Sequence, residues 1–183
     1  MMAMRRAGRI VRAGGVVAYP TEGVFGLGCR PDDGESVLRI IEMKERDPLQ
    51  GVLLIAADAA QLDGWVALPD DAPALAGSAA HPVTWIVPAD ESVPLWIRGQ
   101  HDGIAVRITA HPVAAELCRT AGMPLVSTSA NIAGRPPART PYVLRRNFRR
   151  LVDFIVPGHC GPARGPSEIR DLATGRTVRA AAG

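Results

Sequence analysis

Short runs of hydrophobic residues alternate along the chain with segments whose hydrophobic residues recur at the three-to-four-residue spacing of a helix. The short runs are bounded by glycine, proline or polar clusters, which is typical of buried strands. Strands are predicted over 15–20, 51–57, 83–87, 103–108 and 124–130. Helices are predicted over 1–15, 35–46, 113–121 and 140–150, with weaker helical segments up to residue 77.

The helix over 35–46 has sequence signals at both ends. Asp32 or Asp33 can accept a hydrogen bond from the free N–H groups of the first turn. Pro48 disfavours helical geometry at Asp47, so the helix is expected to end there. The residues before this helix, 21–34, are rich in glycine and are predicted to form a loop.

The remaining segments decide the kind of sheet. Residues 152–158 read VDFIVPG and are mostly apolar, and 167–179 resemble a hairpin that turns around Thr174 and Gly175. The short connections between some strands leave no room for crossover helices, which favours a mixed sheet over a parallel one and argues against a plain Rossmann fold. We predict one α/β domain over 1–183.

Composition narrows the class of protein. The chain is 47% hydrophobic with a net charge of +3, which is compatible with an anionic ligand but does not establish a nucleic-acid partner. Cys29, Cys118 and Cys160 are far apart, so neither a disulfide framework nor a zinc site is indicated, and a cytoplasmic location is the default. The arginine-interrupted N-terminus resembles no signal peptide, and no apolar run is long enough to span a membrane.

The first candidate for chemistry is Lys44, the only lysine in the sequence, two residues before Arg46. If Pro48 breaks the helix here, both side chains can turn toward one ligand. Lysine would then supply a point charge, and arginine a pair of parallel N–H donors, to phosphate oxygens. The alternative is that both merely complement the negative end of the helix. The spacing alone leaves both interpretations open.

Two further loops carry polar groups at a strand end. Ser127, Thr128, Ser129 and Asn131 can hold phosphate oxygens or a hydrated magnesium ion, or they form an ordinary polar turn. Thr21 and Glu22 follow a strand that ends in Tyr19 and Pro20, with glycines at 23, 26 and 28 that allow close backbone approach. A flexible loop without a ligand explains those glycines equally well.

Other familiar motifs are missing. The sequence has no GxxxxGK[ST], no GxGxxG that opens a helix and no GxSxG. Its histidines lack the spacing of metal ligands, and Cys29 is interpreted as a small buried residue rather than a nucleophile. The helix 140–150 presents an arginine-rich face, usually a solvated surface, although RNA can use such a face.

Taken together, these loops resemble the YrdC/TsaC family of threonylcarbamoyl-AMP synthases from about Gly14 to Arg179. The resemblance is carried by VVAYPTEGVFGLGC, the Lys44-x-Arg46 pair, PVTWIVPA, AVRITAHP, PLVSTSANIAGRPP and PSEIRD. It implies a twisted open mixed sheet with flanking helices and a concave, positively charged cavity. It also implies condensation of L-threonine, bicarbonate and ATP into threonylcarbamoyl-adenylate and pyrophosphate.

The resemblance implies roles for individual residues. Lys44 and Arg46 match the family's KxR signature, and Ser129 with Asn131 matches its SxN signature; both are associated with nucleotide binding. On this basis Lys44 and Arg46 would hold the triphosphate and the leaving pyrophosphate, and Ser129 and Asn131 would hold phosphate or magnesium-bound water. Thr21, with Tyr19, would position threonine or its carbamate. Further cavity-lining candidates are Thr84, Arg107 and Ser167.

The same resemblance implies ATP with Mg²⁺ as substrate, no permanent cofactor and no metal site built from a side-chain cluster. The product would pass to a tRNA threonylcarbamoyl-transferase complex, with direct tRNA contact as a further possibility and no membrane partner. Three departures from the family pattern bear on substrate affinity: Gln50 where a basic residue is usual, Asp47 where proline is common, and SAAH over 78–81.

Two rival interpretations remain at the level of sequence. One is a non-catalytic RNA-binding module of the same fold, in which the cavity and the arginine-rich face from Arg145 to Arg150 bind RNA. The other, a carbamoyl-transfer domain similar to those of hydrogenase maturation proteins, is disfavoured because no acylphosphatase-like or zinc-finger segment accompanies it.

Overall fold

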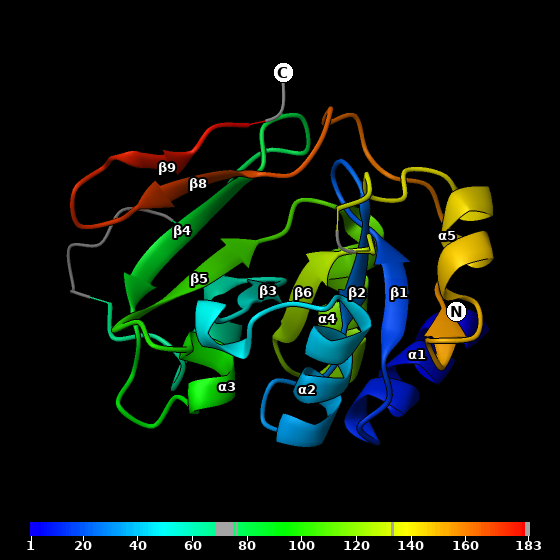
Figure 1. The fold of residues 1–183 in the computed structure, drawn as a ribbon, viewed down its shortest axis with the longest axis horizontal. Helices are drawn as coiled ribbons and strands as arrows, with labels where there is room; N and C mark the ends of the chain where they lie inside the picture. The colour runs from blue at the N-terminus through cyan, green and yellow to red at the C-terminus, as the bar shows by residue number, and fades with distance from the viewer. Residues whose placement is uncertain (69–74, 76, 133, 182–183) are drawn as a thin grey trace.

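The computed structural model describes residues 1–68, 75, 77–132 and 134–181. Within them, nine strands form one sheet in the order β7-β1-β2-β6-β3-β5-β4-β8-β9 (Figure 1). The strands are β1 (Val17–Pro20), β2 (Phe25–Gly28), β3 (Leu53–Ala56), β4 (Val83–Pro88), β5 (Gly103–Ile108), β6 (Leu125–Ser129), β7 (Phe154–Ile155), β8 (Glu168–Asp171) and β9 (Thr177–Arg179). The helices are α1 (Met2–Arg12), α2 (Gly34–Met43), α3 (Leu95–Arg98), α4 (Pro112–Ala121) and α5 (Pro141–Phe148), with 3₁₀ turns η1 (Pro48–Gln50) and η2 (Ala59–Leu62).

The sheet is mixed, as the short connections predict. Strands β1 and β7, β3 and β5, and β4 and β8 pair in parallel. The remaining neighbours pair antiparallel, including β6 with both β2 and β3. The twisted open sheet with flanking helices in Figure 1 confirms the predicted fold class.

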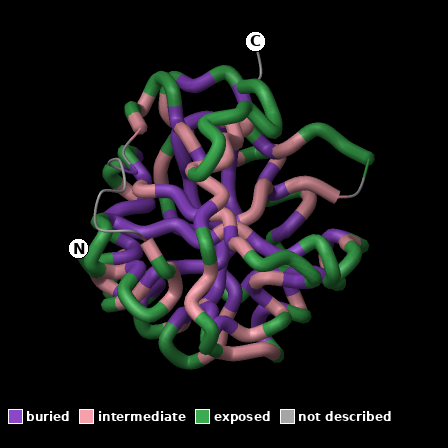
Figure 2. Tube along the Cα trace, turned by 90° about the vertical axis from the view of Figure 1, so that its left-hand side faces the viewer, coloured by how far each residue is buried: buried purple, intermediate pink, exposed green. Residues whose placement is uncertain are grey.

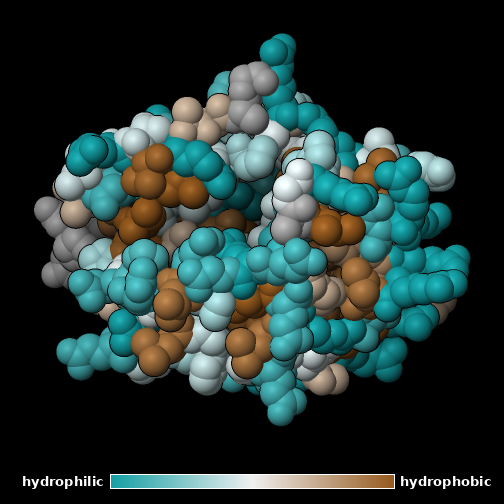
Figure 3. Space-filling view, viewed as in Figure 1, coloured by the Kyte–Doolittle hydropathy of each residue, from teal (hydrophilic) through white to brown (hydrophobic). Residues whose placement is uncertain are grey.

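Alternation along the strands sends side chains to two separate cores. Ala18, Leu54 and Val126 point to the face covered by α2, α3 and α5. Val17 and Ile55 point to the opposite face, where α1 and α4 pack. Buried residues follow the strands through the interior, with exposed residues outside them (Figure 2). The surface seen in Figure 3 is largely hydrophilic, with hydrophobic residues in separate patches.

Helices α1 and α4 cover only part of their face, because α1 contacts β1 and β7, and α4 contacts β1 and β3. The cavity described below is lined by residues of β4, β5 and β8 together with the nearby ends of β3 and β6. An incomplete helical layer therefore leaves part of the sheet open to a ligand.

The predicted strands all occur, as do the helices over the N-terminus, 35–46, 113–121 and 140–150, with bounds that differ by up to three residues. The hairpin over 167–179 is confirmed by the antiparallel pairing of β8 and β9. Asp33 caps α2 by accepting a hydrogen bond from the Glu35 N–H. Of the weaker helical segments, η2 is present, and residues 69–74 and 76 lie outside the described residues.

Two predictions of local structure are wrong, and one helix was not predicted. The glycine-rich stretch 21–34 contains strand β2, which glycine conceals because it removes the alternating side chains that mark a strand. Helix α2 ends at Met43 rather than near Arg46, because Glu45 adopts a left-handed conformation (φ 49°) before Pro48 is reached. Helix α3 has no counterpart in the prediction because its four residues are too few to show helical periodicity.

Candidate active site

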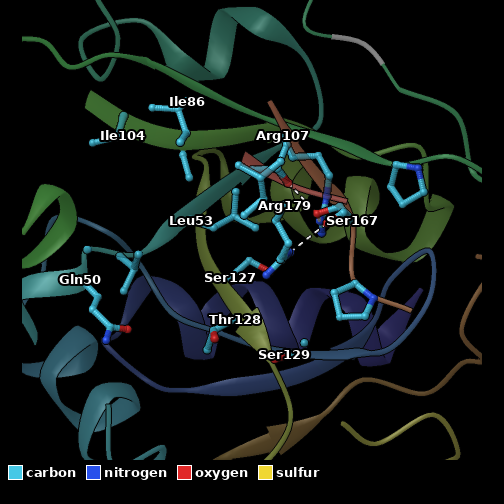
Figure 4. A pocket seen from close by; sticks show the side chains of 18 of the residues that line it. Gln50, Leu53, Ile86, Ile104, Arg107, Ser127, Thr128, Ser129, Ser167 and Arg179 are labelled. Atoms are coloured by element: carbon cyan, nitrogen blue, oxygen red, sulfur yellow. Dashed lines mark hydrogen bonds between the residues drawn. The ribbon is translucent and has the colours of Figure 1, made fainter. Parts of the chain in front are cut away.

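A cavity of about 480 Å³ lies on the sheet face that α1 and α4 leave open. Among the described residues, four arginines and a single carboxylate, that of Glu22, line it, so this part of its wall carries excess positive charge. Ile86 and Ile104 form an apolar part of the wall, away from Arg107, Arg179 and Ser167 in Figure 4, and Leu53 adds a further apolar side chain. The cavity is therefore suited to a ligand with both anionic and apolar parts.

Lys44 joins α2 to the end of β6. It lies at the C-cap of α2, and its ammonium donates to the Ser129 carbonyl at 2.7 Å, the Asn131 carbonyl at 3.2 Å and the Asn131 side-chain oxygen at 2.8 Å. The Ser129 hydroxyl donates to that same Asn131 oxygen at 2.7 Å. The two predicted signature segments are thus in direct contact.

The charge of Lys44 is only partly compensated. The side chain is buried, and its described partners are neutral oxygens rather than a carboxylate. Burial, followed by the charge of Arg46, lowers the pKa of Lys44 from 10.5 to about 8. An anion placed nearby would stabilise the protonated form.

Arg46 lines the cavity, whereas Lys44 does not. Its Nη2 donates to the Gly51 carbonyl at 2.8 Å, and its buried Nε has no hydrogen-bond partner among the described residues. Burial lowers the pKa of Arg46, and the charge of Asp47 opposes that effect. The Asp47 carboxylate caps η1 by accepting from the Leu49 N–H at 2.9 Å.

A second polar cluster lies where β4, β5 and β8 meet. Arg107 Nη1 donates to the Ser167 hydroxyl at 3.0 Å, and Ser167 shares a 2.7 Å hydrogen bond with Thr84. Arg179, from β9, donates to the Ser167 carbonyl at 2.9 Å. Figure 4 shows Arg107 and Arg179 gathered around Ser167 at the cavity wall.

Glu22 is the carboxylate behind this cluster. Its Oε1 accepts from the Thr109 hydroxyl at 2.7 Å and the Ala110 N–H at 3.0 Å, while Oε2 lies 3.6 Å from Arg107 Nη2. Burial alone would raise the pKa of Glu22, but the charge of Arg107 and these hydrogen bonds outweigh burial and lower it. Glu22 therefore stays ionised and compensates part of the charge of Arg107.

No carboxylate pairs with Arg179 among the described residues. Burial, and then the charges of Arg107 and Arg46, lower the pKa of its guanidinium. Three of the four cavity arginines thus come from separate segments, and the charges of Arg107 and Arg46 disfavour the charged form of Arg179. An anionic ligand would relieve this repulsion.

Tyr19 and Thr21 come from the β1 end. The Tyr19 hydroxyl donates to the Ser127 hydroxyl at 2.8 Å, and burial raises the pKa of this phenol. The Thr21 hydroxyl donates to the Val24 carbonyl at 2.7 Å. Thr21 lines the cavity, whereas Tyr19 supports Ser127, which lines it.

The predicted site residues divide into two groups. Those that line the cavity are Thr21, Arg46, Thr84, Arg107, Ser129 and Ser167. Lys44, Asn131 and Tyr19 instead hold lining residues in place through hydrogen bonds. Sequence reasoning missed Arg179. Its strand could have been identified, because a hairpin was predicted there and the resemblance extends to that residue.

Of the departures noted above, Gln50 lines the cavity, while the segment 78–81 forms a turn closed by a Ser78–His81 hydrogen bond.

Other candidate chemistries find little support. No group of three or more His, Cys, Asp or Glu is arranged to hold a metal within the described ranges. All three cysteines are free, and burial raises the pKa of Cys29, as expected for a small core residue rather than a nucleophile. No helix among the described residues is long and apolar enough to cross a membrane.

A mixed α/β sheet whose open face carries an arginine-lined cavity, without a nucleophile or metal cluster in its described part, defines a class of proteins that bind anionic small molecules through charge and positioning. The chain belongs to the Sua5/YciO/YrdC family, whose model, described as "Telomere recombination", matches residues 9–181.

Relatives cover nearly the whole chain. It is 53% identical over 179 residues to a threonylcarbamoyl-AMP synthase of Nitrosococcus oceani, with 96% of each chain covered. It is 50% identical over 173 residues to one of Stenotrophomonas maltophilia, covering 92% of this chain and 93% of the relative. Among solved structures, P. abyssi Sua5 complexed with L-threonine superposes with a TM-score of 0.83 at 29% identity. The match covers 95% of this chain and 52% of that one, so this chain spans about half the length of Sua5.

Proposed function

We propose that this protein is a nucleotidyltransferase that condenses L-threonine, bicarbonate and ATP into threonylcarbamoyl-adenylate and pyrophosphate. The observation that carries the proposal is the convergence of Arg46, Arg107 and Arg179 on one cavity whose described wall carries a single carboxylate. A nucleoside triphosphate and an amino acid carboxylate would supply the missing negative charge. The names of the relatives support this enzyme rather than a non-catalytic RNA-binding module.

The reaction requires no protein nucleophile. The amine of threonine adds to bicarbonate with loss of water and gives a carbamate. A carbamate oxygen then attacks the α-phosphorus of ATP, and the bond to pyrophosphate breaks. The protein's task is to bring like-charged reactants together and to stabilise the charge on the leaving pyrophosphate.

We assign the phosphates to the side of the cavity near Arg46. Arg46 and Arg179 have guanidinium groups that can pair with phosphate oxygens in a fork. The Ser129 hydroxyl, held by Asn131 and Lys44, would complete this subsite. The Lys44 ammonium, just behind the cavity wall, would attract the phosphates through its positive charge.

We assign threonine to the cluster around Arg107. Arg107 and the Ser167 hydroxyl would bind its carboxylate, with Thr84 holding Ser167 in place. Thr21 would contact the amine or the carbamate. Tyr19 would act indirectly, because its hydroxyl is committed to Ser127.

Magnesium enters this proposal as part of the ATP substrate. The ion prefers carboxylate, phosphate and water oxygens, and the one carboxylate that the described residues bring to the wall, that of Glu22, is buried beside Arg107. These residues do not fit a protein-held magnesium site, so no step is assigned to the metal. No permanent cofactor is required by the chemistry.

In the cell, the adenylate would be handed to a tRNA threonylcarbamoyl-transferase complex. The product is a reactive mixed anhydride, so transfer between proteins would limit its hydrolysis. We expect a cytoplasmic location, with which the free thiols of Cys29, Cys118 and Cys160 are compatible.

Pyrophosphate release from ATP, magnesium and bicarbonate tests the proposal. Release that requires L-threonine, and that L-serine and buffer without amino acid do not support equally, is the expected result. An absence of threonine-dependent release from correctly folded protein that still binds ATP would overturn the proposed reaction. Arg176→Gln, an exposed substitution away from the cavity, is the control for protein quality.

A further inference from the structure

Arg98 is a cavity arginine that the subsites assigned above do not use. It ends helix α3 and lines the cavity with Arg46, Arg107 and Arg179. The residue is half-buried, and its Nη1 donates to the His101 carbonyl at 3.3 Å. No carboxylate forms an ion pair with Arg98 within the described part of the chain. Its positive charge is therefore available to an anionic ligand.

Backbone contacts hold Arg98 close to the segment that follows Arg46. The Gln100 N–H donates to the Leu49 carbonyl at 3.1 Å. A Cβ on Gly51 would lie 2.9 Å from the Arg98 carbonyl oxygen, and Gly51 has a φ of 63°, so this close approach requires glycine. The Gly51 carbonyl also accepts the hydrogen bond from Arg46. Arg46 by its side chain and Arg98 by its backbone are thus both placed beside Gly51.

The sheet register shows which end of the cavity this is. The segment that meets α3 leads directly into β3. Strand β6 runs antiparallel to β3 with Ser127 opposite Leu53, so Ser129 lies toward the start of β3. Arg107 pairs with Ile55, farther along β3. The arginine of α3 therefore lies at the end proposed for the phosphates rather than at the end proposed for threonine.

The proposed reaction directs the leaving group toward the same end. The carbamate oxygen bonds to the α-phosphorus while the bond to pyrophosphate breaks on the opposite side, because the attacking and leaving oxygens are roughly in line. Threonine is assigned to the cluster around Arg107. The pyrophosphate would therefore point away from Arg107, toward Arg46 and Arg98.

We propose that Arg98 binds the terminal phosphate of ATP and stabilises the charge of the pyrophosphate as it leaves. A guanidinium can pair with two phosphate oxygens at once. The inference rests on the proposed function and adds to it a residue that distinguishes a triphosphate from a monophosphate. Because AMP has no terminal phosphate, Arg98 contributes to the binding of ATP and not to that of AMP.

Gln50 gives a way to move this charge within the cavity. Its exposed side chain lines the same cavity, one residue before the Gly51 that packs against Arg98. Gln50 is neutral, at a position where a basic residue is usual in the family pattern. Arg98 supplies from the neighbouring helix the positive charge that Gln50 does not, so a lysine introduced at position 50 should replace part of its effect.

Calorimetric binding of magnesium-ATP and of AMP tests the proposal. Arg98→Gln should lower the affinity for ATP by about tenfold, as expected for one lost charged hydrogen bond. Its affinity for AMP should stay within about twofold of wild type. Gln50→Lys, added to Arg98→Gln, should recover roughly threefold of the lost ATP affinity. Arg176→Gln removes the same charge from an exposed position outside the cavity and should match wild type.

Binding is measured without threonine and bicarbonate, so this test is separate from that of the proposed reaction. Protein that binds ATP through Arg98 but shows no threonine-dependent pyrophosphate release would overturn the reaction and still support Arg98 as a phosphate-binding residue. Where release is observed, Arg98→Gln should raise the KM for ATP and leave the KM for threonine unchanged.

Four results contradict the inference. Unchanged ATP affinity in Arg98→Gln shows that the residue contacts no phosphate. Equal losses of affinity for ATP and AMP show that Arg98 acts on another part of the nucleotide or on the fold. An equal loss of ATP affinity in Arg176→Gln assigns the effect to net charge. An absence of recovery on adding Gln50→Lys shows that Arg98 does not supply a charge missing at position 50.

Discussion

The Lys44 ammonium lies 2.8 Å from the side-chain oxygen of Asn131, and its other two hydrogen bonds go to backbone carbonyls of the same turn. The two residues are 87 positions apart in sequence. One cation therefore fixes the turn after β6, and with it the direction of the Ser129 hydroxyl at the cavity wall.

This contact predicts strong coupling between the two residues. Lys44→Met and Asn131→Ala should each lower pyrophosphate release by tenfold or more, on the order of 1.4 kcal/mol in transition-state stabilisation. The double variant should lose little beyond the worse single one, because both act on the same turn. Lys44→Arg should not restore activity, since a planar fork cannot reproduce three divergent donors. Kinetics of the four proteins measure the coupling, and strictly additive losses would show independent roles.

ATP binding should consume protons above pH 8. The pKa of Lys44 is lowered to about 8 by burial and by Arg46, so its ammonium loses its proton in ligand-free protein above that pH. Triphosphate beside the turn favours the charged form, and at pH 8.5 binding should take up roughly 0.7 of a proton. Calorimetry in buffers of different ionisation enthalpy measures this uptake. An equal uptake in Lys44→Met would assign the proton to another group.

The lowered pKa of Lys44 also makes the stability of the folded protein depend on pH. Because the unfolded chain holds the Lys44 proton more tightly than the native protein, the cost of burying this charge is present below pH 8. That cost disappears as pH rises from about 8 toward 10.5. The contribution of Lys44 alone therefore makes the protein more stable over this interval, and the difference from Lys44→Met in urea unfolding should change in parallel.

Replacing Arg107 by lysine should affect threonine more than ATP. Lysine keeps the charge beside Glu22 but cannot contact both Glu22 and Ser167 as the guanidinium does. The KM for threonine should rise by roughly tenfold, with a smaller change in the KM for ATP. Steady-state kinetics with each substrate varied separate the two effects. A selective rise in the KM for ATP would instead place phosphate at Arg107.

Helix α5 offers a test of the hydrophobic core. Phe148 is fully buried and Tyr142 is 72% exposed on the same helix. Phe148→Ala should lower the free energy of unfolding by about 3–5 kcal/mol through lost burial and the cavity it leaves. Tyr142→Ala should stay within about 0.5 kcal/mol of wild type. Urea unfolding of both variants measures the difference, and similar losses would mean that α5 is held by other contacts.

Sequence patterns predicted the elements that carry strong periodicity and missed those that do not. The apolar run of β3 and the amphipathic spacing of α4 were clear, and short connections indicated a mixed sheet. Strand β2 was hidden because Gly26 and Gly28 carry no side chains to reveal alternation. The end of α2 was placed too late because the left-handed conformation of Glu45 leaves no mark in the residue pattern. The single-domain organisation over 1–183 stays a prediction.

For the site, the resemblance identified the segments, but only the fold distinguishes their roles. Nothing in the sequence separates Arg46, which lines the cavity, from Lys44, which does not. The convergence of Arg179 on Ser167 depends on the pairing of β9 with β8, a long-range property. The residue roles assigned above therefore rest on the proposed function and await its tests.

The sheet order also has a consequence for how fast the protein reaches its native state. Strand β2 pairs with β6, β1 with β7 and β4 with β8, and each pairing joins residues far apart along the chain. Such non-local pairing slows folding, because loop-closure entropy is lost before the contacts form. Ser129 on β6 and Thr84 on β4 line the cavity, so part of its wall is completed only when two of these distant pairings have formed.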